Sequence, residues 1–162
     1  MEIAILALGC FWGPEKKFGK IEGIVETEVG YCGGKMSNTS YREVCTGETE
    51  HAEVVKLTFD PKKISYEQII EYFFKFHDPT TLNRQGPDIG TQYRSEIFYN
   101  NDEQKKISYS VLDKLNKKFN SKIVTNVSEN KNYTRAEEYH QEYLKKNQLF
   151  AHKISFLSHK LI

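Results

Sequence analysis

The chain opens with six apolar residues, Ile3 to Leu8, that lead straight into the turn sequence Gly9-Cys10-Phe11-Trp12-Gly13. An unbroken apolar run of this length predicts a buried strand. Pro14 and Glu15 then predict the start of a helix, because proline suits the first turn and an acid there faces the positive end of the helix dipole. We therefore expect a strand, a tight turn that carries Cys10, and a helix.

Cys10 has two interpretations at this point. A thiol beside the unpaired backbone N–H groups of a helix start favours the thiolate, so its pKa is expected to be lowered. Cysteine is also one of the residue types most often buried as simple packing. The turn alone leaves both interpretations open, and the rest of the chain has to decide between them.

Composition limits the classes of function. The 162 residues are 38% hydrophobic and carry a formal net charge of +1, which gives no electrostatic case for binding nucleic acid or an anionic membrane. We expect no membrane span and no signal peptide, because no apolar run has the required length. A cytoplasmic location is the resulting expectation.

The three cysteines, Cys10, Cys32 and Cys45, include no CxxC pair. An odd number without such a pair argues against a disulfide framework and against a structural zinc site. We therefore expect a reducing compartment, no metal, and at least one thiol that stays free for chemistry.

Hydrophobic periodicity and capping patterns predict the remaining elements. Strands are expected at 23–31, 51–59, 93–99 and 122–127, and helices at 41–45, 65–77, 101–119, 134–144 and, on the surface, 148–162. The segment 80–92 is expected to be a long functional loop. The irregular alternation predicts one α+β domain over residues 1–162, a two-layer sandwich with a mixed sheet, flanking helices and a ferredoxin-like core.

Four other residues could join Cys10 in a site. Glu53 stands at a strand start before an apolar face, so burial would raise its pKa and keep it protonated as a general acid, although a surface glutamate is the commoner case. Asp88 lies in the long loop, where a simple turn role is equally ordinary. Tyr41 and Tyr93 could each donate a phenol hydrogen bond, or merely pack in an aromatic-rich interior.

Two histidines allow a different mechanism. Cys10 with His51 or His140 could form a Cys-His hydrolase or acyltransferase, but no third orienting residue is evident. His140 falls on an apolar stripe and is expected to be a core histidine. The sequence contains no phosphate-binding glycine motif, no HExxH motif and no clustered metal ligands.

The turn sequence around Cys10 resembles the signature of the class A peptide methionine sulfoxide reductase family. Further blocks resemble that family in the same order and cover the chain from about Ile3 to Asn147. They are Gly30-Tyr31-Cys32-Gly33-Gly34, Tyr41 to Gly47, His51-Ala52-Glu53, His77 to Thr80, Arg84 to Ser95 and Ala136 to Gln141.

The resemblance implies thiol-dependent reduction of methionine-S-sulfoxide, free or in proteins, to methionine, and hence repair of oxidised proteins without a cofactor. Cys10 would attack the sulfur and become a sulfenic acid, and Glu53 would supply a proton to the sulfoxide oxygen. The resemblance also implies substrate-binding roles: Tyr41 and Tyr93 would bind the oxygen, Phe11 and Trp12 would wall the methyl pocket, and Asp88 would organise the site.

The C-terminal segment departs from the family pattern, because no cysteine follows Asn147 where many relatives carry resolving cysteines. Three ways to reduce the sulfenic acid remain open: glutathione with glutaredoxin, direct attack by thioredoxin, or an internal thiol. Cys32 is the internal candidate, provided that its Cα can come within about 7 Å of that of Cys10. A sulfoxide-binding module without catalysis is disfavoured by the presence of both Cys10 and Glu53.

Overall fold

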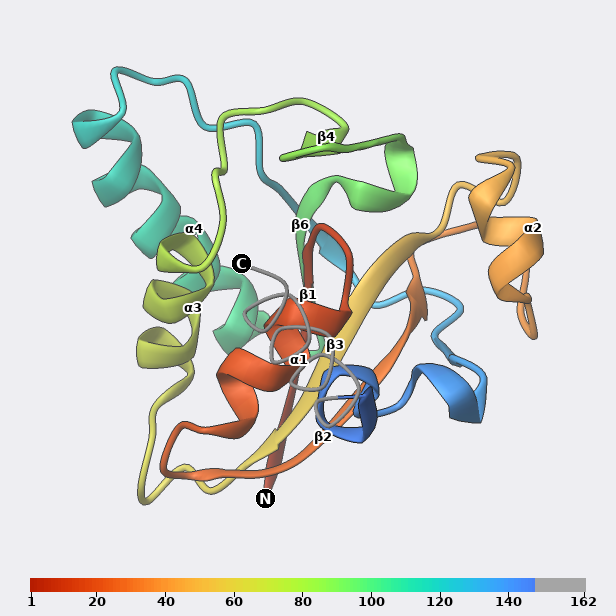
Figure 1. Cartoon of the computed structure of the whole chain (residues 1–162). Coiled ribbons are helices and arrows are strands. Elements are labelled where there is room, and N and C mark those ends of the chain that lie inside the picture. Colours follow the sequence, from red (N-terminus) through yellow and green to blue (C-terminus); the bar gives the residue numbers. More distant parts are fainter. Residues whose placement is uncertain (148–162) are drawn as a thin grey trace, which may run out of the picture.

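The opening apolar run forms β1 (Glu2–Leu8), an inner strand of a six-stranded mixed sheet in the order β7-β6-β1-β3-β2-β8 (Figure 1). The structure is a computed structural model and describes residues 1–147. The surface helix predicted for 148–162 lies outside the described residues.

Four antiparallel strands make the centre of the sheet. β2 (Ile24–Cys32) and β3 (Ala52–Phe59) pair with each other, β3 pairs with β1, and β1 pairs with β6 (Ser95–Tyr99). With α1 (Trp12–Gly19) after β1 and α3 (Tyr66–Lys75) after β3, this is a βαββαβ unit with the ferredoxin-like order. The predicted α+β fold with a mixed sheet is confirmed.

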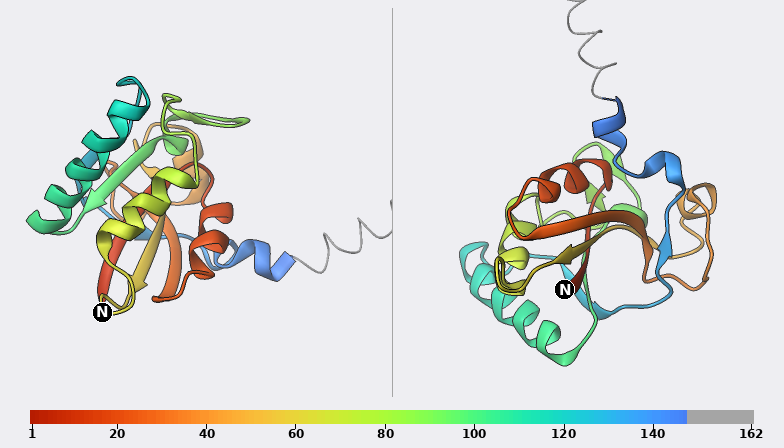
Figure 2. Two further views of the ribbon diagram at one scale, coloured as in Figure 1. Left: turned by 90° about the vertical axis from the view of Figure 1, so that its left-hand side faces the viewer. Right: turned by 90° about the horizontal axis from the view of Figure 1, so that it is seen from below.

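Two further strands extend the sheet at its edges. β7 (Asn126–Glu129) runs parallel to β6 after the long helix α4 (Asp102–Lys118). β8 (Thr134–Arg135) pairs antiparallel with the end of β2. The views in Figure 2 show α3 and α4 side by side on one side of the sheet, and the described end of the chain beside α1.

β1 is buried on both faces, which explains its uninterrupted apolar sequence. Ala4, Leu6 and Leu8 pack in the main core with Phe18 and the apolar sides of α3 and α4. On the opposite face, Ile5 and Ala7 pack with residues that include Cys32, Val54 and Phe98. The alternation along β1 therefore distributes one strand between two hydrophobic clusters.

The capping predictions for α2 (Tyr41–Cys45), α3 and α4 are confirmed. Ser40 and Ser65 form capping boxes with Glu43 and Gln68, and Asn101 accepts a hydrogen bond from the Gln104 backbone N–H. The loop 80–92 contains a short hairpin of β4 (Arg84–Gln85) and β5 (Asp88–Ile89), followed by the 3-10 turn η1 (Thr91–Tyr93). Tyr93 therefore belongs to that turn, not to the strand predicted for 93–99.

Two predicted elements are wrong. The strand expected at 122–127 begins only at Asn126. The helix expected over 134–144 is instead β8, the 3-10 turn η2 (Glu138–His140) and an extended Gln141. Pairing with β2 overrides the helical pattern there, because the Ala136 backbone N–H donates to the Val29 carbonyl.

Candidate active site

Cys10 lies half-buried between the end of β1 and the start of α1. The turn that places it needs glycine at position 9, where φ is +94° and an added Cβ would lie 2.8 Å from the side chain of Gln85. That close approach packs the β4–β5 hairpin against the cysteine turn. Asp88 of β5 is thereby brought to the same region as Cys10.

The expected low pKa of Cys10 is wrong for this structure. Burial raises the pKa of the thiol to about 11, the Trp12 backbone N–H opposes this shift, and the nearby carboxyl groups of Glu53 and Asp88 add to it. Loss of solvent thus outweighs the helix start, because a thiolate away from water needs more stabilisation than one N–H group supplies. The resting residue is a neutral thiol.

Glu53 is buried, at 1% exposure, at the start of β3. Its Oε1 accepts a hydrogen bond of 3.1 Å from the backbone N–H of Phe11, the residue after the cysteine. The inward orientation expected from the sequence is therefore confirmed. This contact ties the carboxyl group on β3 to the turn that carries the thiol.

The pKa of Glu53 is raised to about 8, chiefly by burial and further by the charge of Asp88, against the opposing hydrogen bond from Phe11. A carboxyl group with that pKa is mostly protonated at pH 7. The site therefore holds a neutral acid beside a neutral thiol, and both can take part in proton transfer.

Tyr41, the first residue of α2, and Tyr93 in η1 are half-buried near the carboxyl group of Glu53. Burial is the main cause that raises both phenol pKa values, that of Tyr93 to about 12, with the charge of Glu53 contributing to each. Both phenols remain protonated at neutral pH and can donate hydrogen bonds. The structure thus brings all five expected polar residues of the site together: Cys10, Tyr41, Glu53, Asp88 and Tyr93.

Aromatic rings from distant segments line the same region. Phe11 is buried, and its ring centroid lies 5.2 Å from that of His140, which also contacts Trp12 at 5.7 Å and Tyr41 at 4.5 Å. The Trp12 ring also stacks on the ring of Tyr143, with ring centroids 3.9 Å apart and an angle of 11° between the planes. These rings form an apolar wall beside the thiol.

Neither histidine is arranged as a base for Cys10. His51 is buried; its Nδ1 accepts from the Gly34 backbone N–H, and its Nε2 contacts the Met36 carbonyl at 2.5 Å. His140 Nδ1 accepts from the Trp12 indole N–H at 3.1 Å. Both histidines serve packing and orientation, as expected for His140, and the geometry gives the Cys-His hydrolase no support.

Glu137 is a supporting residue that the sequence pattern did not reveal, because that pattern predicts it only as part of a helix at 134–144. Its carboxylate accepts hydrogen bonds from the Tyr41 backbone N–H at 3.0 Å and from the Tyr31 hydroxyl at 2.8 Å. It thereby fixes the start of α2, from which the Tyr41 side chain projects. Only the tertiary contact between β8 and β2 makes this role visible.

The other two thiols lie in environments that differ from each other and from that of Cys10. Cys32 is fully buried, and its Sγ contacts the Asn130 side-chain oxygen at 3.2 Å. It packs on the opposite face of the sheet from Tyr31 and Glu53, because successive residues of a strand alternate between faces. Cys45, at the end of α2, is exposed.

Residues 1–147 contain no group of three or more His, Cys, Asp or Glu side chains that could hold a metal ion. No helix in the same range is long and apolar enough to cross a membrane.

Comparison with known proteins points to one family. The family model described as peptide methionine sulfoxide reductase matches residues 2–160. Peptide methionine sulfoxide reductase MsrA of Pelagibacter ubique is 65% identical over 146 residues, which make up 90% of this chain and 99% of that relative. The enzyme of the same name from Methanothermobacter thermautotrophicus is 50% identical over 148 residues, covering 90% of this chain and 88% of the relative.

Solved structures agree with the sequence comparisons. Reduced Mxr1 from Saccharomyces cerevisiae superposes with a TM-score of 0.87 at 42% identity, covering 91% of this chain and 86% of Mxr1. Methionine sulfoxide reductase A of Corynebacterium diphtheriae superposes with a TM-score of 0.81 at 36% identity, covering 91% of this chain and 76% of that one. The thiol, the protonated carboxyl group and the aromatic wall thus occur in a chain that belongs to the peptide methionine sulfoxide reductase family.

Proposed function

We propose that this chain reduces the S epimer of methionine sulfoxide, in proteins or free, with Cys10 as the nucleophile and Glu53 as the proton donor. The observation that carries the proposal is the hydrogen bond from the Phe11 N–H to Glu53, which holds a mostly protonated carboxyl group beside the thiol turn. The family membership of the chain supports thiol-dependent sulfoxide reduction as its activity.

The substrate is a polar S–O group that carries a small methyl group. Glu53, Tyr41 and Tyr93 would donate hydrogen bonds to the oxygen, since all three are protonated at neutral pH. The rings of Phe11 and Trp12 would contact the methyl group, as aromatic faces suit soft apolar groups. Asp88 would orient the substrate at the hairpin side of the site.

In the first step, the sulfur of Cys10 bonds to the sulfoxide sulfur as the oxygen takes a proton from Glu53. The oxygen then passes from the methionine sulfur to the Cys10 sulfur, as the methionine S–O bond and the new S–S bond both break. Methionine leaves, Cys10 is a sulfenic acid, and the proton of the thiol has returned to Glu53. The sulfoxide sulfur gains two electrons and the cysteine sulfur loses two. Because both groups start neutral, substrate binding has to promote the loss of the thiol proton.

Recycling then needs two further thiols. A first thiol would condense with the sulfenic acid to form a mixed disulfide and water, and a second would release Cys10 by thiol–disulfide exchange. Yeast Mxr1 has been solved in complex with Trx2, and that complex superposes on 88% of this chain with a TM-score of 0.63 at 28% identity. This supports thioredoxin as the reductant here, with glutathione and glutaredoxin as the alternative, in a reducing compartment such as the cytoplasm.

The decisive experiment is a single turnover with matched peptides that contain either sulfoxide epimer. The S epimer should yield one equivalent of methionine peptide without added reductant, and the intact mass of the enzyme should then increase by one oxygen. The Cys10→Ser variant should yield none. Equal consumption of the R epimer, or product formation by Cys10→Ser, would contradict the proposal.

A further inference from the structure

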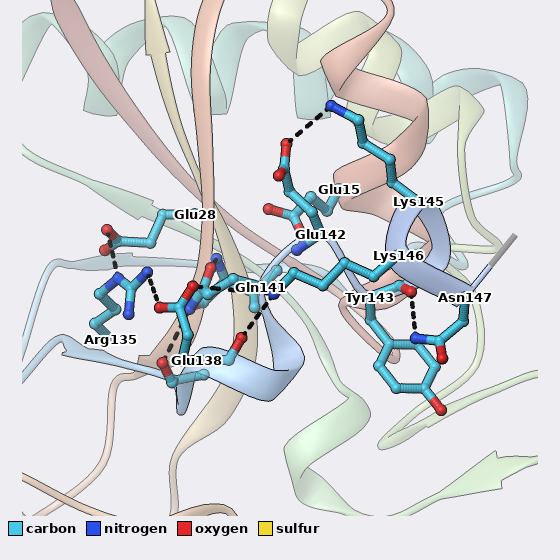
Figure 3. A network of polar contacts seen from close by, with 12 residues as sticks. Glu15, Glu28, Arg135, Glu138, Gln141, Glu142, Tyr143, Lys145, Lys146 and Asn147 are labelled. Carbon is cyan, nitrogen blue, oxygen red and sulfur yellow. Dashed lines mark hydrogen bonds and ion pairs between the residues drawn. The ribbon is translucent and has the colours of Figure 1, made fainter.

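One buried carboxyl group has no place in the proposed reaction. Glu15 lies on α1 one turn after Trp12 and is only 4% exposed. Its Oε1 accepts a hydrogen bond of 2.6 Å from the backbone N–H of Glu142, and its Oε2 accepts one of 3.0 Å from the Thr27 hydroxyl. Figure 3 shows its side chain directed at the backbone of residue 142.

The backbone that Glu15 holds is unusual. Glu142 has φ of +49°, a left-handed conformation that a residue with a side chain rarely adopts. The chain turns there, from the extended Gln141 into the helical residues 143–147. Such a conformation persists only when its surroundings hold it in place. The Glu15 carboxyl group is one of those surroundings.

Tyr143, the residue that follows this turn, packs against the apolar wall beside the thiol. The Tyr143 ring stacks on Trp12 with centroids 3.9 Å apart, while the indole N–H donates to His140. Trp12 and Glu15 are three residues apart and so share one face of α1. One helix face thus contacts two consecutive residues, Glu142 through Glu15 and Tyr143 through Trp12.

We propose that Glu15 is a positioning residue for methyl recognition. By holding the turn at Glu142, it fixes the Tyr143 ring against Trp12 and so sets the orientation of the indole beside the thiol. Thr27 anchors the same carboxyl group to β2, so that α1, the sheet and the end of the described chain meet at one side chain. This inference rests on the proposed role of Trp12 as a wall of the methyl pocket.

The test compares Glu15→Met, which keeps the size of the side chain but removes both acceptors, with Glu15→Gln, which restores an oxygen for the Glu142 N–H. Glu71→Met, at an exposed position of α3, is the matched control. KM and kcat for a methionine-S-sulfoxide peptide are measured together with the emission of Trp12, the only tryptophan.

Glu15→Met should raise KM by about 10-fold, the scale of methyl discrimination in an apolar pocket. Its kcat should stay within about twofold of the original, and tryptophan emission should move to longer wavelength as the indole face meets water. Glu15→Gln should return both readouts towards the original values. If Glu15→Met lowers only the unfolding temperature and leaves KM and emission unchanged, the positioning role is refuted.

Trp12→Ala separates this inference from the proposed function. If it leaves KM unchanged, the methyl pocket is assigned wrongly. If it raises KM while folded Glu15→Met does not, only the role of Glu15 fails.

Amide hydrogen exchange in the unsubstituted enzyme tests the same contact without any variant. The Glu142 amide hydrogen should exchange with solvent more slowly than the amides of exposed neighbours, because it is bonded to a buried acceptor. Exchange as fast as that of an exposed amide would show that the contact does not persist and would overturn the proposal.

Discussion

The backbone N–H of Phe11 donates a 3.1 Å hydrogen bond to the carboxyl oxygen of Glu53, which lies 42 residues further along the chain. The bond joins the thiol turn at the end of β1 to the start of β3. Burial keeps this carboxyl group mostly protonated at pH 7, so the contact sets the proposed proton donor next to the proposed nucleophile.

Replacing Cys10 by serine should abolish methionine formation, because a hydroxyl group is a far poorer nucleophile towards sulfur and cannot form a sulfenic acid. Stopped assays with a methionine-S-sulfoxide peptide and excess dithiol measure this loss. Cys45→Ser is the matched control, because serine keeps a small polar group at this exposed position next to Tyr41, and it should keep the first-step rate.

Glu53→Ala should slow the first reductive step by about 10²–10⁴-fold, the usual contribution of a positioned general acid. Glu53→Gln keeps the acceptor for the Phe11 N–H but cannot supply a proton in the same way, so it should also be slow. Single-turnover kinetics separate this step from recycling. A Glu53→Gln rate equal to that of the original enzyme would show that proton donation comes from another group.

The rate of the first step should fall as the pH rises through about 8. The pKa of Glu53 is raised to about 8, so the active protonated form is present below that value and is lost above it. Cys10, with a pKa of about 11, remains a thiol over this range. Because its proton passes to Glu53 within the step, the reacting form carries both protons, and its population falls above about pH 8. Single-turnover rates between pH 6 and pH 10 check the profile, and Glu53→Gln should lack this limb.

Cys32 should not form a disulfide with Cys10 in a single turnover. Its side chain is fully buried on the face of the sheet opposite to Glu53, and a disulfide needs Cα atoms within about 7 Å and suitably directed side chains. Intact mass after one turnover should therefore show one added oxygen. A loss of two hydrogens that disappears in Cys32→Ser would establish Cys32 as the resolving thiol instead.

Gly34→Ala should destabilise the fold by about 1–3 kcal/mol, the usual cost of overpacking a filled interior. An added Cβ would lie 2.4 Å from the Thr49 carbonyl oxygen and 2.5 Å from the His51 ring. Since His51 stands two residues before Glu53, activity should fall as well. Chemical denaturation gives the change in the free energy of unfolding, and Gly13→Ala, where the added Cβ meets nothing within 4 Å, is the control.

Local patterns determined much of this protein. The apolar run of β1, the capping serines of α2 and α3, and the glycine of the cysteine turn predict their own structure, because each depends on residues a few positions apart. The ordered blocks that resemble the reductase family also gave Cys10 and Glu53 as the candidate catalytic residues. Patterns of residues close together in the sequence were enough for these conclusions.

Only the tertiary structure decided the rest. The segment from Thr134 to Leu144 has a helical pattern of apolar residues. Hydrogen bonds to β2 nevertheless make its beginning a strand, and Gln141 is extended. Pairing with the edge of a distant strand stabilises the segment more than its local helix propensity does. The pKa of Cys10 followed the same rule. A helix start lowers it, but the solvent excluded by packing against other segments raises it further, and burial depends on the whole fold.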